Sequence, residues 1–251
     1  MLDENHAARR RTRNSRRDPE LTRWEIGRGD LEAAVQEFAT HGPRGARTED
    51  IAHRTNTSKR MIFYYFGSKE GLYRAVLEEN YRRIRALESS LRLDHLEPAA
   101  ALRELIRASL EHYERNPDLA RIVAMENLIM HGGVAAQIDE FSAMNASAVE
   151  TIAGILERGR CLGIFQEGPG APSALDVHQV LSALVLNRIE HQWTFSLAFG
   201  RDMLGDDSAH VRDLIEEAVM RLVSGGPPGG DRAPAVSGMM ARAAGRTSPI
   251  V

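Results

Sequence analysis

Apolar residues at helical spacing, repeated over residues 21–224, constrain the fold of this chain more than any other feature of its sequence. In the first such segment, spacings of three and four residues place on one helix face Leu31, Ala34, Val35 and Phe38. No run of alternating β-branched residues, which would indicate strands, is present, and tryptophan and tyrosine are scarce. The sequence therefore predicts an all-α fold.

Turn-forming clusters divide this pattern into separate helices. They lie at His41-Gly42-Pro43, Asn116-Pro117 and His131-Gly132-Gly133, and two later loops read GPGAPS and GRDMLGDD. Helices are expected over about residues 21–41, 48–55, 58–66, 68–91, 98–115, 117–130, 134–161, 175–199 and 207–223.

A tight turn joins the second and third of these helices. Thr48 is a good N-cap for the second helix, Ser58 opens the third, and Ser68 caps the fourth. Asn56 lies in the turn, and asparagine is one of the few non-glycine residues that tolerate a left-handed backbone. Three short helices, the last two separated by such a turn, form a helix-turn-helix arrangement whose second helix enters the DNA major groove.

The third helix, KRMIFYYF, combines an apolar face with a face of cations and phenols. Ile62 and Phe66 stand one turn apart and are expected to fix the helix against the first two. The phenols of Tyr64 and Tyr65 are placed where they can reach phosphates. At the N-terminal end, where a recognition helix meets base edges, stand Lys59, Arg60 and Met61.

The stretch RTEDIAHRTNTSKRMIFYYFGSKEGLYRAVL resembles the DNA-binding region of the TetR/AcrR family of bacterial transcriptional regulators. The resemblance covers about residues 28–77, and its specific elements are AAVQEFATHG, Thr48, Ile51-Ala52, Ser58, IFYYF and SKEGL. It implies an N-terminal three-helix helix-turn-helix DNA-binding domain followed by a larger α-helical ligand-binding and dimerisation domain.

The resemblance also implies roles at the DNA. Thr48 would cap its helix and touch a phosphate, Phe63 would pack near the base-reading residues, and the tyrosines would bind phosphates. Lys69, at a helix N-terminus, would bind a phosphate as well. The residues expected at the DNA are Thr48, Ser58, Lys59, Arg60, Met61, Phe63, Tyr64, Tyr65 and Lys69.

The sequence departs from the family pattern at several positions. Asn56-Thr57 replaces the usual Gly-Val, and Arg60 stands where a small residue is usual. Asp30 and Glu37 occupy positions of the first helix that are often apolar. An operator sequence known for another member therefore does not transfer to this chain, and the first helix is expected to pack with a slightly different face.

Composition and charge predict the domain boundaries. Residues 1–19 are polar and arginine-rich and are expected to form a disordered basic arm, either passive or contacting the minor groove. Residues 20–85 would form the DNA-binding domain with the start of a connecting helix, residues 86–223 the ligand-binding and dimerisation domain, and residues 224–251 a disordered tail. Residues 1–85 hold 18 Lys/Arg against 13 Asp/Glu, and the remainder holds 14 against 22. This asymmetry suggests a polyanion-facing end on an acidic body.

The last two helices are expected to form a homodimer contact. The helix at about 175–199 is apolar on most sides and must be covered on most sides, so a partner subunit is expected there. The helix at about 207–223 adds a second apolar stripe. Two such helices from each subunit would form a four-helix bundle across a two-fold axis.

A ligand pocket is expected where polar residues stand among apolar helix faces. For Asn187 and His191, an interface pair or a satisfied core group is an equal alternative, and core packing is the stronger interpretation of the methionines. No cationic cluster accompanies the candidates, so an apolar or amphipathic effector is expected. The candidate lining residues are Tyr113, Met125, Glu126, Asn127, Met130, Phe141, Met144, Asn187, His191 and Trp193.

No signature of an enzyme or of a metal site is present. The nine histidines show no HExxH or Cys-His spacing, and no cofactor motif is found. Cys161, the single cysteine, forms no internal disulfide and suits a reducing cytoplasm. No apolar run approaches the roughly 20 residues of a membrane span, and the N-terminal arginines lack the apolar segment of an export signal.

These features favour a homodimeric cytoplasmic regulator, most often a repressor in this family. It would bind a palindromic double-stranded DNA operator and be released by a small apolar or amphipathic effector. Two alternatives stay open: a DNA-binding regulator without an effector, and an all-α binding or catalytic protein with a vestigial DNA-binding head.

Overall fold

The computed structural model describes the backbone of residues 19–225 and the side chains from residue 31 onward. Within this range all regular structure is helical, which confirms the predicted all-α class. The helices are α1 (Pro19–Gly45), α2 (Thr48–Arg54), α3 (Lys59–Phe66), α4 (Lys69–Ser90), η1 (Leu93–His95), α5 (Pro98–Arg115), α6 (Pro117–Leu128), η2 (Ala135–Gln137), α7 (Phe141–Cys161), α8 (Ala174–Glu190), α9 (Gln192–Phe199) and α10 (Ser208–Ser224). Almost all of the predicted arm and tail lie outside the described residues.

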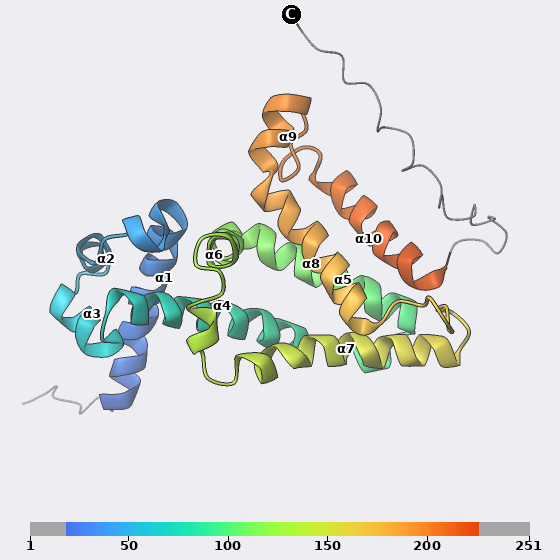
Figure 1. Cartoon of the computed structure of the whole chain (residues 1–251), viewed down its shortest axis with the longest axis horizontal. Coiled ribbons are helices and arrows are strands. Elements are labelled where there is room, and N and C mark those ends of the chain that lie inside the picture. Colours follow the sequence, from blue (N-terminus) through green and yellow to red (C-terminus); the bar gives the residue numbers. More distant parts are fainter. Residues whose placement is uncertain (1–18, 226–251) are drawn as a thin grey trace, which may run out of the picture.

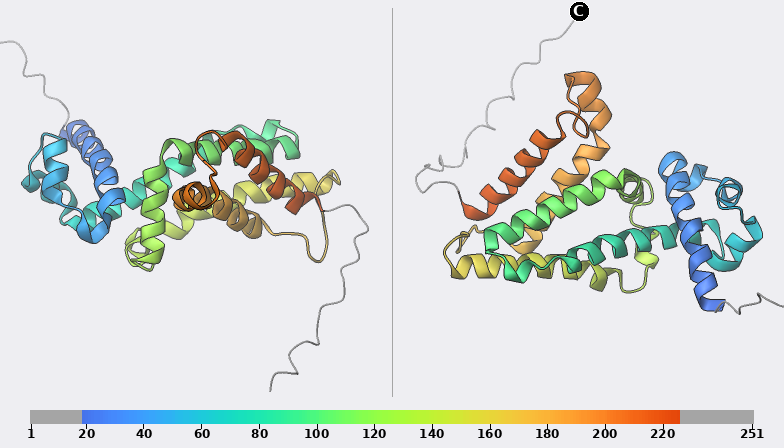
Figure 2. Two further views of the ribbon diagram at one scale, coloured as in Figure 1. Left: turned by 90° about the horizontal axis from the view of Figure 1, so that it is seen from above. Right: turned by 180° about the vertical axis from the view of Figure 1, so that it is seen from behind.

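The helices form two parts of unequal size. Figure 1 shows α1, α2 and α3 gathered at one end of the molecule, which we call the head, and α4 running from the head into a bundle of α5, α7, α8 and α10, which we call the body. Helix α6 lies beside α1, and both views of Figure 2 place it between head and body. Helix α9 continues beyond the end of the bundle.

Two predicted helices are divided in the structure, and a third has a kink where its end was predicted. Helix α1 is kinked at Gly42, whose φ of 71° is left-handed, where the sequence predicted its end. The predicted helix at 134–161 begins as η2 and becomes α7 only after Glu140, which has a φ of 57°. The predicted helix at 175–199 is divided at His191 into α8 and α9. In the last two cases the apolar spacing continues across the break, so periodicity alone did not locate it.

The head core contains residues from outside the head. Phe38, Ile51 and Ile62 from the three head helices are fully buried in one cluster with Leu72 and Leu77 of α4. The same cluster includes residues that follow α5 in the chain, namely Leu119, Ile122, Val134 and Ile138. Helix α6 and the segment around η2 therefore complete the head core.

A second core holds the body together. It consists of inward-facing residues of α5, α7, α8 and α10, among them Leu102, Ile106, Ile152, Val177 and Val219, all at most 1% exposed. Pro98 and Pro117 stand at the first positions of α5 and α6, where a missing N–H removes no helical hydrogen bond. The body is thus an α-helical bundle packed around its own interior.

Candidate nucleic-acid interface and body cavity

The turn between α2 and α3 follows from Asn56 and Ser58. Asn56 has a φ of 51°, as predicted, and the N–H of Thr57 donates to the carbonyl of Ala52 at 3.0 Å. The Ser58 hydroxyl accepts from the N–H of Met61 at 3.2 Å and caps α3. These bonds end α2 and start α3 within four residues, which fixes the angle between the two helices.

The turn from α3 into α4 depends on glycine. Gly67 has a φ of 77°, and the Ser68 hydroxyl accepts from the N–H of Gly71 at 2.9 Å. A Cβ on Gly71 would lie 2.1 Å from the carbonyl oxygen of Phe66, so no larger residue fits without moving the backbone. The close approach holds the C-terminal end of α3 against the start of α4.

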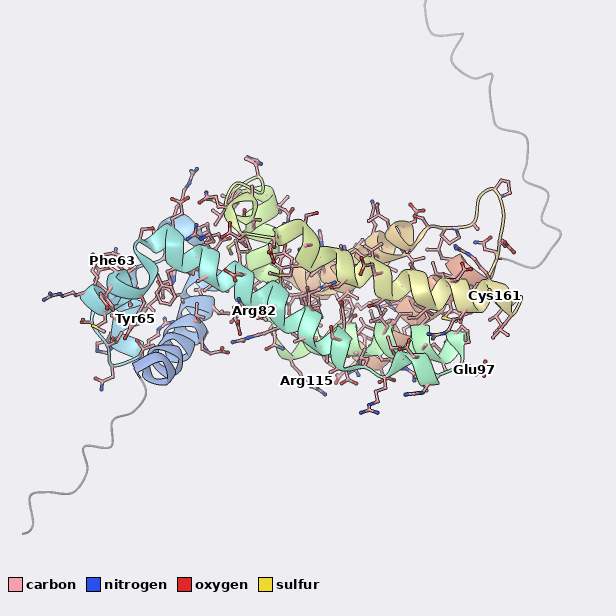
Figure 3. All side chains as sticks on the ribbon, turned by 90° about the horizontal axis from the view of Figure 1, so that it is seen from below. Phe63, Tyr65, Arg82, Glu97, Arg115 and Cys161 are labelled. Carbon is pink, nitrogen blue, oxygen red and sulfur yellow. The ribbon has the colours of Figure 1, made fainter. Side chains whose placement is uncertain are left out.

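Helix α3 has the two faces that its sequence predicts. Ile62 is fully buried, and Phe66 packs partly buried against the same cluster. On the outer face, the side chains of Arg60 and Phe63 are exposed, and Tyr64 is 76% exposed. Figure 3 labels Phe63 and Tyr65 at the outer end of the head, far from Cys161 at the opposite end of the molecule. Met61 and Tyr65 are half-buried. The structure therefore brings Arg60, Phe63 and Tyr64, which are spaced by three and four residues, onto one exposed surface.

The two lysines of the chain are both engaged within the head. Lys59 pairs with Glu49 of α2 and lies over the Phe63 ring at 5.4 Å from its centroid. The hydrogen bond from Lys59 lowers the pKa of the Glu49 carboxyl. Lys69 donates to the carbonyls of Arg44, at 2.9 Å, and Ala46, at 3.2 Å. Because two of its three ammonium hydrogens connect α4 to the end of α1 and to the residue that follows it, only one is free for a phosphate.

Thr48 does not cap α2. It is the first residue of the helix and is buried, and its hydroxyl donates to Glu49 at 3.2 Å. Arg47 is the N-cap residue, and no side chain caps the helix. The prediction that Thr48 is the cap is therefore wrong, because the chain enters the helix one residue earlier than the hydroxyl position suggests.

Glu37 organises the head in a way that the sequence did not reveal. Only 1% of its side chain is exposed, and its carboxylate lies 3.2 Å from Nη2 of Arg54 and 3.1 Å from Nδ1 of His41. It also accepts from the backbone N–H of Arg47 at 3.1 Å. One carboxylate thus connects α1, the following loop and α2. The only available signal was an acidic residue at a position where the family pattern is apolar.

The body contains a small cavity where α4, α5, α7 and α8 meet. Its volume is about 40 Å³, and it is partly open to solvent. Its apolar wall includes Ile84, Leu105, Ala148, Ile152, Leu181 and Val185. Its polar wall consists of Arg85, Glu88, Ser109, Tyr113, His178 and Ser182. The lining therefore mixes both kinds of side chain rather than being apolar.

Only Tyr113 of the predicted pocket residues lines this cavity. Met130, Phe141 and Met144 pack against the head core, and the Phe141 ring meets Tyr81 at 4.9 Å. Asn187, His191 and Trp193 lie exposed on α8 and α9, and the Asn187 amide is 3.1 Å from Nδ1 of His191. These six residues were predicted to share a pocket with Tyr113, and they do not.

The residues of α6 predicted for the pocket also have structural roles. Glu126 is buried and accepts at 2.8 Å from each of the N–H groups of Val134 and Ala135, which orients the segment around η2. Asn127 is exposed and donates to the carbonyl of Val123. Met125 lies near the kink of α1, its sulfur 3.9 Å from the Cβ position of Gly42. The prediction failed because α6 faces the head instead of the interior of the body.

Ionisable groups of the cavity wall are shifted by burial. Burial lowers the pKa of His178, and the charge of Arg85 lowers it further. Burial raises the pKa of Tyr113 to about 12, and it raises the pKa of the Glu88 carboxyl while Arg85 opposes that shift. The histidine and the tyrosine are therefore held neutral at pH 7.

Metal and membrane chemistry have no support in the part of the chain that the structure describes. Among the side chains described, those of residues 31–225, no three of His, Cys, Asp or Glu gather as a metal site would require. None of the described helices is both long enough and apolar enough to cross a bilayer.

Two family models match the chain, one for each part. The model described as "Bacterial regulatory proteins, tetR family" matches residues 31–76. The model described as "Tetracyclin repressor-like, C-terminal domain" matches residues 98–219. The first match contains α2, α3 and the tight turns, and the second contains α5 to α9 and most of α10.

Similar curated proteins are transcriptional regulators and not enzymes. The chain is 40% identical to the HTH-type transcriptional repressor NicS of Pseudomonas putida over 138 residues, which are 55% of this chain and 64% of NicS. It is 37% identical to the HTH-type transcriptional regulator RutR of Escherichia coli over 129 residues, 48% of this chain and 60% of RutR. Each match spans less than two thirds of the relative.

Solved structures share the fold. A bacterial regulatory protein in the tetR family from Rhodococcus RHA1 superposes with a TM-score of 0.62 at 17% identity, and the superposition covers 80% of this chain and 97% of that protein.

Proposed function

Because the chain belongs to the TetR family of bacterial regulatory proteins, we propose that it is a DNA-binding transcriptional regulator. It binds a palindromic operator as a homodimer and is released by a small-molecule effector. The observation that carries the proposal is the two-faced α3, whose inner face buries Ile62 while Arg60 and Tyr64 are exposed on its outer face.

Some residues of α3 contact the bases of the DNA, and others contact its phosphates. Arg60, which forms no ion pair within residues 31–225, stands in the first turn and reads a base edge, with Met61 beside it. Tyr64 and Tyr65 donate their phenols to phosphates, which positions the helix without reading sequence. Lys59 breaks its ion pair with Glu49 and contacts a base edge instead. Ser58, Thr48 and Phe63 support the helix, and Lys69 offers its remaining hydrogen to a phosphate.

The homodimer forms through α8 and α10. Both helices bury one face in the body core and leave apolar side chains on the other, with Leu175 of α8 and Leu214 of α10 exposed. Two copies of this pair would form a four-helix bundle across a two-fold axis. The axis must set the two α3 helices about 34–36 Å apart, or a multiple of that, so that both enter major grooves on one face of the duplex.

Helix α4 connects the cavity to the DNA-binding surface. It begins at Lys69, which is bonded to the head. Its residues Arg85 and Glu88 line the cavity about 24 to 28 Å farther along the helix, at 1.5 Å per residue. A ligand that shifts this part of α4 changes the separation of the two α3 helices. The required coupling is typically about 1–3 kcal/mol.

The experiment is a pair of titrations with the full chain. Its affinity for DNA from its own upstream region is measured by fluorescence anisotropy, with and without a bound effector, and effector affinity is then measured with and without that DNA. Thermodynamic linkage requires the two ratios to be equal. Absence of sequence-preferring DNA binding would favour a binding protein with a vestigial head.

A regulator without an effector is the second candidate, and the small volume of the cavity, about 40 Å³, favours it. A bound molecule that changes neither DNA affinity nor its own affinity in the presence of DNA would establish this second function.

A further inference from the structure

The cavity contains an ion pair with incomplete hydrogen bonding. Nη1 of Arg85 lies 2.8 Å from a carboxylate oxygen of Glu88, and both side chains are nearly buried. The geometry of this contact is not that of a hydrogen bond, so these two atoms and Nε of Arg85 have no hydrogen-bond partner among the described residues. Buried donors and acceptors in this state carry a desolvation cost that a ligand can relieve.

The rest of the cavity wall carries no charge. Ser109 and Ser182 are neutral, the Ser109 hydroxyl already donates to the carbonyl of Leu105, and burial favours the neutral forms of Tyr113 and His178. One cation and one anion therefore leave the cavity with a net charge of zero. An anionic ligand would meet repulsion from Glu88, and a cationic ligand would meet repulsion from Arg85.

We propose that the cavity binds a small neutral molecule that bears a planar amide-like group, whose carbonyl oxygen accepts from Arg85 and whose N–H donates to Glu88. The inference rests on the effector role proposed for this cavity and names the chemical class of that effector. Of the apolar or amphipathic effector expected from the sequence, this inference selects the amphipathic kind, a polar group with an apolar remainder.

The size and the lining of the cavity agree with such a group. A volume of about 40 Å³ holds roughly three water-sized groups, since one needs about 10–15 Å³, and an amide has three heavy atoms. Ile84, Leu105 and Leu181 form a wall on which the ring or chain that carries the amide can lie. One molecule can then bond to the polar groups of the wall and cover its apolar side chains.

Three probes of nearly identical shape test the proposal: benzamide, benzoate and benzamidine, which are neutral, negative and positive at pH 7. Each is titrated into the full chain by calorimetry, without DNA. Benzamide is expected to bind about tenfold or more tightly than either charged probe, the ratio that one hydrogen bond to a charged group supplies.

A change of one charge in the cavity should change the preferred probe. In Glu88→Gln the cavity becomes positive, and benzoate should gain about tenfold or more relative to benzamide. Glu78→Gln is the matched control, because Glu78 lies on the same helix, pairs with Arg82 at the surface and is absent from the cavity lining. It should keep the preference of the native chain. Thermal unfolding establishes that both variants are folded.

Three outcomes would overturn the proposal. They are a native chain that prefers benzoate or benzamidine, an unchanged order of the probes in Glu88→Gln, and no binding of any probe at about 10 mM. Since no DNA is present, none of these outcomes bears on operator recognition. Conversely, benzamide binding without an effect on DNA affinity would contradict the regulatory role and leave the ligand class intact.

Discussion

Helices α3 and α9 have eight residues each and leave aromatic side chains exposed, yet they differ in charge and in anchoring. Helix α3 carries two cations, buries Ile62 and is capped by a serine side chain. Helix α9 contains no charged residue, has no side-chain cap and buries none of its residues. It exposes 66% of Trp193, 85% of Leu197 and 71% of Phe199.

Under the function proposed above, the difference suits two kinds of partner. Tyrosines beside cations offer hydroxyl groups and charge, which suit phosphates, and water can cover them when DNA is absent. Tryptophan, leucine and phenylalanine without neighbouring charges offer only apolar area, which suits the surface of another protein subunit. Aromatic exposure alone therefore does not identify a nucleic-acid surface, and the cations and the cap of α3 make the distinction.

A buried ionic group supports each exposed helix. In the head, Glu37 connects Arg54 and the backbone of Arg47, and so fixes the helix that precedes α3. In the body, Arg188 pairs with Glu114 and donates to the carbonyl of Met203 at 2.8 Å and to Ser208 at 3.1 Å. These bonds connect the C-terminal end of α8, from which α9 projects, to α5 and to the start of α10.

The largest expected effect is on stability, from Arg188→Met. Removing one member of a buried pair leaves the Glu114 carboxylate with only the half-exposed Arg212, so the free energy of unfolding should fall by about 3–5 kcal/mol. Urea denaturation followed by circular dichroism measures it. Arg221→Met is the control, because Arg221 is exposed on α10 and pairs only with the exposed Glu217. It should cost about 0.5 kcal/mol or less. Equal losses in the two variants would contradict the anchoring role of Arg188.

The next effect concerns α3. Arg60→Ala should weaken operator binding by about 1–3 kcal/mol and relax the preference at one base pair, as expected for the loss of a bidentate contact to guanine. Tyr64→Ala is the comparison variant, because loss of a phosphate contact should weaken binding to all sequences alike. Anisotropy titrations against a library of single base-pair changes distinguish the two patterns. If neither variant alters affinity or specificity, α3 is not the reading helix.

The smallest effect concerns α9. If its apolar side chains meet a second subunit, Leu197→Ser should raise the dissociation constant of the dimer about tenfold, and the stability of the subunit should not change because the side chain is exposed. Sedimentation equilibrium measures the constant. Ser196→Ala, at a neighbouring exposed position, is the control. An unchanged constant in Leu197→Ser would assign α9 to a different partner.

The caps and turns of the head could be predicted from the sequence, because each depends on residues a few positions apart. The cavity could not be predicted, because its wall combines residues that are distant in the sequence. Ser58, Ser68 and Asn56 act through atoms within a few positions, and the structure confirms their predicted roles. Arg85 and Glu88 read in the sequence as an ordinary charged pair of a solvated helix, and only the packing of three other helices over them forms the cavity.

The same reason explains the misplaced pocket residues. The sequence suggested Met130, Phe141 and Met144 as candidate pocket residues, but helical periodicity cannot say which core a residue joins, and these three pack against the head core. The predicted pair of Asn187 and His191 does form, and it lies at the surface of α8 rather than in a pocket. Ligand candidates chosen by composition alone therefore included residues of the head core, whose distant members no local sequence pattern predicts.

The shared core of the head limits how the protein can be re-engineered. Exchanging residues 19–85 for those of another regulator, in order to redirect it to new genes, would set Leu119 and Ile122 of α6 and Val134 and Ile138 of the following segment against a foreign surface. To keep its own core intact, the transplanted head would have to bring with it its own counterpart of α6 and of the residues through 140. The unit of exchange is thus discontinuous in the chain, and a chimera joined at a single point within α4 would carry a mismatched interior.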